Sequence, residues 1–245
     1  MIKNIQGRIV IILPLFLFIN AVILLCSDIE LLYSQEVESL TVQFRRTVAT
    51  EFDSEVAEGQ FYYKSSGYLF VEITNPVSQY LVFDNKKVLI YFPETQEGVE
   101  YPLSSNTIPF VDSFLGHMKN DFGLSDLGFE IVSHNKKQDT LFTTWSPATT
   151  NKKNLGRLVL GTLGEKIVYA ESQDKKERPI KIVYFSSHKL VTGYYFPMEA
   201  KILMRNGNQT KTETISYLEI SHNLDFPDHV NSFVVPPDAN IKVIE

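Results

Sequence analysis

Side chains that could do chemistry are scattered along this chain of 245 residues rather than grouped. The five histidines show neither an HExxH motif nor another paired spacing, so each is predicted to be a surface or turn residue. The run Gly161-Thr162-Leu163-Gly164 lacks the lysine of a phosphate loop, and no GxSxG elbow occurs. Acidic residues are frequent, but no pair stands out as a glycosidase couple. The sequence therefore supports no enzyme, metal or cofactor.

Cys26 is the only cysteine, so the chain can form no internal disulfide and has no zinc-type spacing. It follows an apolar run over residues 9–25, and Lys3 and Arg8 precede that run. This basic, apolar, small order predicts an export signal over residues 1–27, with a cleavage site that could lie as late as residue 34. An uncleaved anchor and an acylated Cys26 are the alternatives. The prediction is an exported, periplasmic protein.

Composition favours a single β domain over residues 28–245. The chain is 44% hydrophobic and contains 17 Phe and 12 Tyr, which suits aromatic-rich strands. Its net charge is −6, and its one basic run, Lys175-Lys176-Glu177-Arg178, is short and mixed, as expected of a solvated hairpin tip. Nucleic acid is therefore excluded as a predicted partner.

Aromatic and β-branched residues are densest over residues 59–93, which predict an antiparallel meander. Its four strands are Gln60–Lys64, Tyr68–Thr74, Gln79–Phe83 and Lys87–Phe92. Alternation places Leu69, Val71 and Ile73 on one face, and Phe70 and Glu72 on the other. Such a sheet must be covered by a second layer or curl around something apolar that the protein carries.

The flanking sequence predicts further strands and two helices. A strand begins at Leu40 and is interrupted at Arg46, although a helix from Leu40 to Val56 is the rival interpretation. An amphipathic helix is predicted over residues 28–39. Another is predicted over residues 104–123, where it either closes the core or forms a movable lid. The remaining predicted strands are Phe129–His134, Thr140–Ser146, Leu155–Leu160, Lys166–Glu171, Ile180–Ser186, Tyr194–Arg205 and Thr212–Ser221.

Several short motifs resemble LolA, the family of periplasmic carriers of outer-membrane lipoproteins. Their order and spacing carry the likeness, which touches most of the chain after the signal. The motifs are Gly59 with Phe61 and Lys64, Thr74-Asn75-Pro76, Asp84-Asn85-Lys86, Tyr91-Phe92-Pro93, Asn106-Thr107-Ile108-Pro109-Phe110 and Ser232-Phe233-Val234-Val235-Pro236-Pro237.

The resemblance implies a mainly β fold with a few helices: an incomplete antiparallel β-barrel, or half-barrel, with a helical lid around an apolar cavity. It implies a monomer that accepts the acyl chains of lipoproteins from an inner-membrane ABC exporter and passes them to an outer-membrane acceptor. A soluble carrier must enclose such chains, because each exposed CH₂ costs about 0.8 kcal/mol in water. The alternatives are a carrier of another envelope lipid and a non-enzymatic envelope-stress or lipoprotein-binding sensor.

On this interpretation the aromatic and aliphatic residues of the strands line the cavity, and apolar residues of the second helix form the lid. A charge at Leu69 is then expected to abolish lipid binding, whereas one at Phe70 is not. The predicted wall is Phe44, Phe61, Tyr63, Leu69, Val71, Ile73, Leu89 and Tyr91, and the predicted lid is Ile108, Phe110 and Phe114.

The chain departs from the family pattern in two places. Lys64-Ser65-Ser66 stands where the family has Lys-Arg-Pro, whose arginine is thought to hold the lid. Residues 175–193 are an extra segment, predicted to be an added hairpin.

Overall fold

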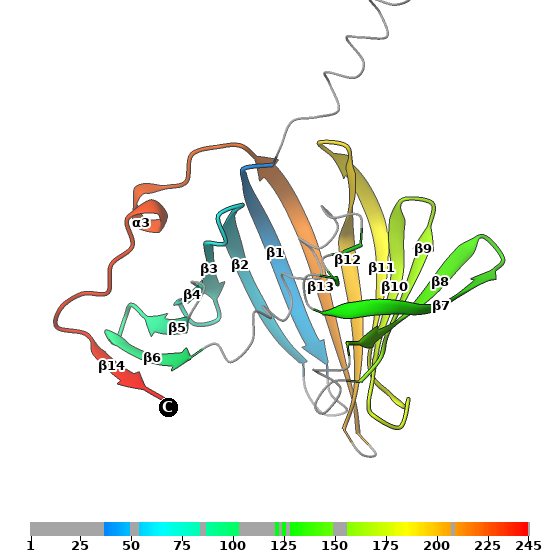
Figure 1. Cartoon of the computed structure of the whole chain (residues 1–245). Helices are drawn as coiled ribbons and strands as arrows, with labels where there is room; N and C mark the ends of the chain where they lie inside the picture. Colours follow the sequence, from blue (N-terminus) through cyan, green and yellow to red (C-terminus); the bar gives the residue numbers. More distant parts are fainter. Residues whose placement is uncertain are drawn as a thin grey trace, which may run out of the picture. The chain divides into compact units, whose positions relative to one another are not determined.

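The computed structural model describes residues 37–49, 54–83, 87–102, 121–122, 124–125, 128–148, 156–206 and 209–244. Their strands form a single 14-stranded sheet that does not close into a barrel, in the order β14-β6-β5-β4-β3-β2-β1-β13-β12-β11-β10-β9-β8-β7. Every pairing is antiparallel except that of β14 with β6. Figure 1 shows the sheet with β1 and β13 side by side near its middle.

In the described residues the elements follow one another as thirteen strands, a short helix and a last strand. They are β1 Ser39–Ala49, β2 Ser54–Lys64, β3 Leu69–Asn75, β4 Gln79–Phe83, β5 Lys87–Phe92, β6 Glu97–Pro102, β7 Phe129–Lys137, β8 Thr140–Pro147, β9 Leu158–Leu163, β10 Lys166–Gln173, β11 Pro179–Val191, β12 Tyr194–Asn206, β13 Gln209–His222, α3 Asp228–Asn231 and β14 Asn240–Val243.

The predicted meander is confirmed, and β4 and β5 have the predicted bounds. One of its breaks contains the cis peptide bond between Asn75 and Pro76, and another, residues 84–86, lies outside the described residues. Residues from Ser39 form a strand rather than the rival helix, because Leu40, Val42 and Phe44 alternate and bury the same face. The irregularity lies between Gln43 and Phe44, where the register against β13 shifts, and not at Arg46.

Residues 175–193 are not an added hairpin. Asp174 to Arg178 form the turn between β10 and β11, as expected for a solvated tip, and Asp174 Oδ1 accepts hydrogen bonds from the Lys176 and Arg178 amides. Strand β11 then pairs with β10 on one side and β12 on the other, inside the sheet. The sequence pattern also missed β6 and β14, which pair with each other beside β5.

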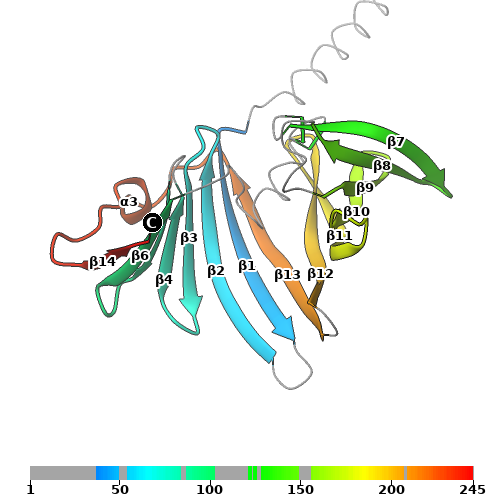
Figure 2. The same ribbon diagram turned by 60° about the horizontal axis from the view of Figure 1, so that its bottom comes forward.

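The sheet has an inner and an outer face. The inner face carries the larger apolar cluster, which joins residues of β1–β4 to residues of β7–β13. Strands this far apart in the sheet share one cluster because the sheet curls, as Figure 2 shows. The outer face of β2–β5 carries the smaller cluster, which includes Tyr62 and Phe70.

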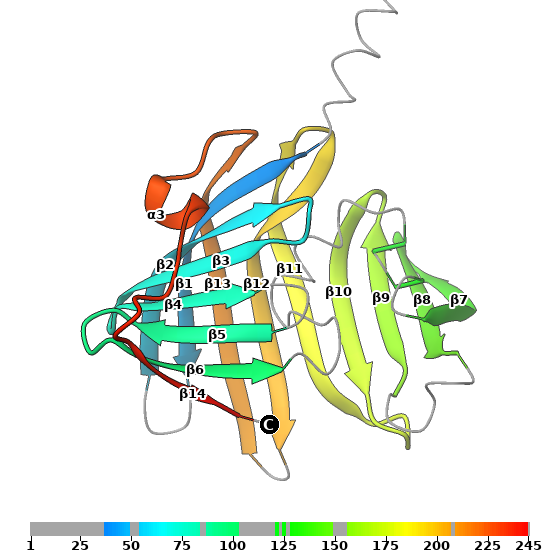
Figure 3. The ribbon, with the colours of Figure 1, turned by 60° about the vertical axis from the view of Figure 1, so that its left-hand side comes forward.

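The C-terminal segment, residues 223–244, covers that outer face. Phe226 and Val230 are buried against Tyr62 and Phe70, and Phe233 packs on the same cluster. The Tyr68 hydroxyl donates to the Val230 carbonyl oxygen over 2.8 Å, and Lys64 Nζ donates to Asn231 Oδ1 over 2.8 Å. Figure 3 shows the segment running from α3 across the meander strands to β14. The predicted ending at Ser232–Pro237 therefore lies in a covering segment.

Residues 37–245 form a compact unit, separate from residues 1–36. The predicted export signal and residues 28–36 of the helix predicted over 28–39 lie outside the described residues, and Ser39 at the end of that prediction is instead the first residue of β1. Within the described ranges, no helix has the length and hydropathy needed to span a membrane.

Candidate functional site

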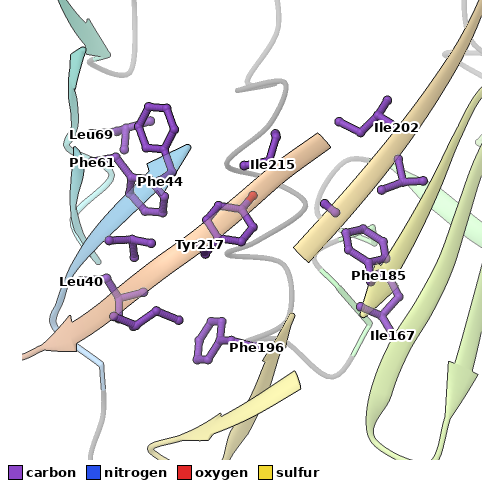
Figure 4. Packing of buried hydrophobic residues seen from close by; sticks show 14 of the residues in the cluster. Leu40, Phe44, Phe61, Leu69, Ile167, Phe185, Phe196, Ile202, Ile215 and Tyr217 are labelled. Atoms are coloured by element: carbon purple, nitrogen blue, oxygen red, sulfur yellow. The ribbon is translucent and has the colours of Figure 1, made fainter. Parts of the chain in front are cut away.

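The inner face of β1, β2 and β3 brings together most of the predicted wall. Pairing places Phe44 opposite Tyr217, Val42 opposite Phe61, and Phe61 opposite Val71. Phe44, Phe61, Leu69 and Val71 are buried in the inner cluster, and Tyr63 and Ile73 pack against it. Figure 4 shows the labelled side chains of Phe44, Phe61 and Leu69 close together on one side of Tyr217.

Leu89 and Tyr91 lie on the opposite face from these six residues. Leu89 pairs with Val82, which packs on the outer cluster, and the Tyr91 ring contacts Phe233 at a centroid distance of 5.9 Å. The inward residue of β5 is Val88, which pairs with Phe83. A one-residue difference in register exchanges the faces of a strand, so the expected wall positions of β5 are corrected to even numbers.

Phe70 also needs a correction. It points outward as predicted, but it is fully buried among Tyr80, Phe233 and Tyr62 with centroid distances of 5.2, 5.4 and 6.2 Å. A charge at this position would lose the hydration of its ionised group, which costs several kcal/mol or forces the group to stay neutral. Phe70 is therefore no neutral control for a charge at Leu69.

Strands β10–β13 supply the other half of the inner face, which the sequence interpretation did not single out. Its buried residues include Ile167, Phe185, Phe196, Ile202, Ile215 and Tyr217. Alternation within Tyr194–Arg205 and Thr212–Ser221 could have indicated the last four as buried. Only the resemblance indicated a cavity wall, and none of its motifs lies in β10–β13. Figure 4 shows Phe185, Ile167 and Ile202 across from Phe61 and Leu69.

The inner face is apolar along most of its length and polar at one end. Tyr217 is buried within the apolar cluster of this face. Burial together with the charge of Glu213 raises the pKa of its phenol. Near the connection between β1 and β2, Arg46 donates to Glu213 through Nε and Nη2 over 2.8 and 2.9 Å. Such a face can bind apolar groups without covalent chemistry.

The predicted lid residues Ile108, Phe110 and Phe114 lie outside the described residues. In the parts of the chain that the structure describes, no three His, Cys, Asp or Glu side chains gather into a metal site. Two histidines are half-buried strand residues rather than surface or turn residues. His188 Nε2 lies 2.7 Å from the Ile167 carbonyl oxygen, and His222 Nδ1 is buried without a hydrogen-bond partner.

No family model and no curated protein matches this sequence. Solved structures do match its fold. A DUF1329 family protein from Desulfovibrio piger superposes with a TM-score of 0.59 at 12% identity, over 80% of this chain and 90% of its own. A LolA superfamily protein from Nitrosomonas europaea gives 0.56 at 13% identity, over 81% and 91%. A domain assigned to the outer-membrane lipoprotein-sorting proteins, from Vibrio parahaemolyticus, gives 0.57 at 11% identity, over 84% and 94%.

These likenesses establish the fold that the sequence motifs predicted. The chain is an open, LolA-like half-barrel, built almost entirely of strands. At such low sequence identity, these similarities are evidence for the fold alone.

Proposed function

We propose that this protein is an exported, periplasmic carrier that binds the acyl chains of lipoproteins or other envelope lipids on the inner face of its sheet. The observation that carries the proposal is the inner face itself. Among the described residues, the only helix and the C-terminal segment cover the outer face, while all strands share one sheet. The larger apolar cluster lies on the inside of the curled sheet, and a concave face lined by aromatic and aliphatic side chains suits an acyl chain.

The contacts on this face suit a reversible carrier. They come from aromatic and aliphatic side chains such as Phe61, Leu69 and Phe185, with Met198 and Met204 packed at the side of the cluster. Methionine is flexible and adapts to differently shaped apolar partners. The half-barrel fold is shared with a LolA superfamily protein and a lipoprotein-sorting domain, which supports the same class of ligand. Delivery by an ABC exporter and release to an outer-membrane acceptor are part of this proposal.

The first test asks whether the protein takes up lipid. The protein produced from the full chain, in the form in which the cell accumulates it, is purified gently and examined by native mass spectrometry. We expect lipid or lipopeptide adducts, and uptake of a pyrene-labelled fatty acid once these are removed. A clean apo mass with no uptake of the probe would overturn the carrier proposal.

A pair of variants tests which face of the sheet binds the ligand. Ala170 lies on β10 opposite Val183 and packs on the inner cluster, whereas Ser186 on β11 is exposed on the outer face. Ala170→Phe fills space beside the inner cluster and should weaken probe binding about tenfold or more, which corresponds to ~1.4 kcal/mol. Ser186→Phe should leave binding unchanged. Circular dichroism confirms folding in both, and equal affinities in the two variants would contradict an inner-face site.

A further inference from the structure

Three charged side chains lie on the inner face at one end of the apolar cluster. The alternation of side chains along each strand places them on this face. Lys181 lies two residues before Val183 on β11, Glu213 two before Ile215 on β13, and Arg46 two after Phe44 on β1. Lys181 lies near the start of β11, Glu213 near the start of β13 and Arg46 near the end of β1, which are the same end of the sheet. The charges are therefore gathered at a single rim.

Arg46 and Glu213 form a closed pair. Both oxygens of the carboxylate accept hydrogen bonds from the guanidinium, and the Glu213 residue is only 7% exposed. The hydrogen bond to Glu213 raises the pKa of Arg46. Bidentate pairing of this kind is strong and fixes the carboxylate on Arg46, so most of the Glu213 charge is balanced by the guanidinium.

Lys181 has no such partner. It is half-buried, and its register neighbours are Met204 on β12 and Ser172 on β10. In the part of the chain that the structure describes, no hydrogen bond or ion pair reaches its ammonium group. Burial lowers its pKa, and the charge of Glu213 only partly offsets that effect. An ammonium that is partly desolvated and unpaired is unfavourable, so a bound anion at this place would be stabilising.

We propose that Lys181 holds the anionic headgroup of an amphiphile whose acyl chain lies along the apolar inner face. The inference rests on the proposed carrier function and narrows its ligand to a carboxylate- or phosphate-bearing lipid. Two cations face one carboxylate at this rim, which leaves a positive charge for the ligand. The exposed Glu55 and Lys211 flank the rim with opposite charges and do not change this balance.

The test compares ligands that differ only in headgroup charge. A pyrene-labelled fatty acid is measured against its methyl ester, and a labelled phosphatidate against the corresponding diacylglycerol, near neutral pH and low ionic strength. We expect the wild-type protein to prefer the charged member of at least one pair by about tenfold or more. The pair that shows the preference identifies a carboxylate or a phosphate as the headgroup.

Two lysine variants provide the matched control. Lys181→Met should abolish the preference for the anion and leave binding of the neutral analogue unchanged, and Lys181→Arg should retain the preference. Lys201→Met removes an exposed charge from the outer face of β12 and should change neither affinity. A preference that survives Lys181→Met, or equal wild-type affinity for both members of each pair, would overturn this inference while the carrier proposal stands. Failure of the wild-type protein to bind any of the four ligands would instead overturn the carrier proposal.

Discussion

Outward-facing aromatic rings occur on both wings of the sheet, and the described residues cover those of one wing only. On the first wing, β2–β5, Phe70 is 0% exposed. On the second wing, β8–β11, Tyr184 is 46% exposed. Both residues point to the outer face of the sheet, so the alternation of residues along their strands does not explain the difference in exposure.

The C-terminal segment makes the difference on the first wing. Phe233 contacts the rings of Phe70, Tyr80 and Tyr91 at centroid distances of 5.4, 5.7 and 5.9 Å. The covered rings thereby become a second core, and burial of each ring stabilises the fold. An outward-facing aromatic side chain becomes part of a core when another segment of the chain packs over it.

The rings on the second wing contact one another instead. Phe142, Tyr169 and Tyr184 form a row across β8, β10 and β11, with centroid distances of 5.7 and 5.6 Å. Gly161 of β9 lies beneath the row, where a Cβ would meet Phe142 Cε1 and Tyr169 Cβ at 3.0 Å each. The Tyr169 hydroxyl donates to Glu171 Oε2 at its edge. Among the described residues, the contacts that stabilise this row come from neighbours within the sheet.

The largest expected effect distinguishes covered from uncovered rings. Phe70→Ala removes a fully buried ring and leaves a cavity under Phe233, so it should lower the free energy of unfolding by about 3–5 kcal/mol. Tyr184→Ala should cost under about 1 kcal/mol, because its ring is half exposed. Urea unfolding of both variants measures the difference, and similar losses would show that the C-terminal segment does not cover the first wing in solution.

Two strand glycines, one in each wing, sharpen the comparison. A Cβ on Gly59 would collide with the backbone carbonyl oxygen of Glu72, which cannot move without displacing β3. Gly59→Ala is therefore expected to cost about 3 kcal/mol. At Gly161 the nearest atoms, Phe142 Cε1 and Tyr169 Cβ, are 3.0 Å away and need to move far less, so Gly161→Ala should cost about 1 kcal/mol.

Thermal unfolding of the two alanine variants, at the same protein concentration, tests this ranking. A Gly161→Ala variant as unstable as Gly59→Ala would mean that the row on the second wing is as rigid as a covered core.

Much of the sheet could be predicted because its strands alternate in the sequence. Leu69, Val71 and Ile73 share the inner face as predicted, and β4 and β5 begin and end where their turn residues place them. The faces of Leu89 and Tyr91 could not be derived in the same way, since nothing within Lys87–Phe92 says which alternate set points inward. The pairing of β5 with β4 and β6 fixes which set points inward, and an apolar residue occurs at both kinds of position.

The covering of Phe70 and the charged rim depend on contacts between distant residues. Phe233 is 163 residues from Phe70, and Arg46 is 167 residues from Glu213. Lone charges such as Lys181 are indistinguishable from surface residues in a sequence, because only strand order brings β11, β13 and β1 together. The motifs resembling LolA gave the half-barrel, but they could not give these pairings.

The smallest expected effect concerns the edge of the uncovered row. Tyr169→Phe removes the hydroxyl that donates to Glu171 and should cost about 1 kcal/mol at neutral pH. Partial burial raises the pKa of Tyr169, and the hydrogen bond and charge of Glu171 raise it further. The folded protein therefore holds this proton more tightly than the unfolded chain, whose tyrosines titrate near pH ~10.

The sign of the pH dependence follows from that difference in proton affinity. The contribution of Tyr169 is complete below pH ~10 and is lost as the pH rises above it, because the unfolded chain then releases a proton that the folded protein retains. Burial also raises the pKa of Tyr217, so alkaline loss of stability alone does not identify Tyr169. The informative quantity is the difference in unfolding free energy between wild type and Tyr169→Phe, which should shrink as the pH rises above ~10. If the two curves stay parallel, the hydroxyl of Tyr169 is hydrated in solution, and the row is stabilised by ring contacts alone.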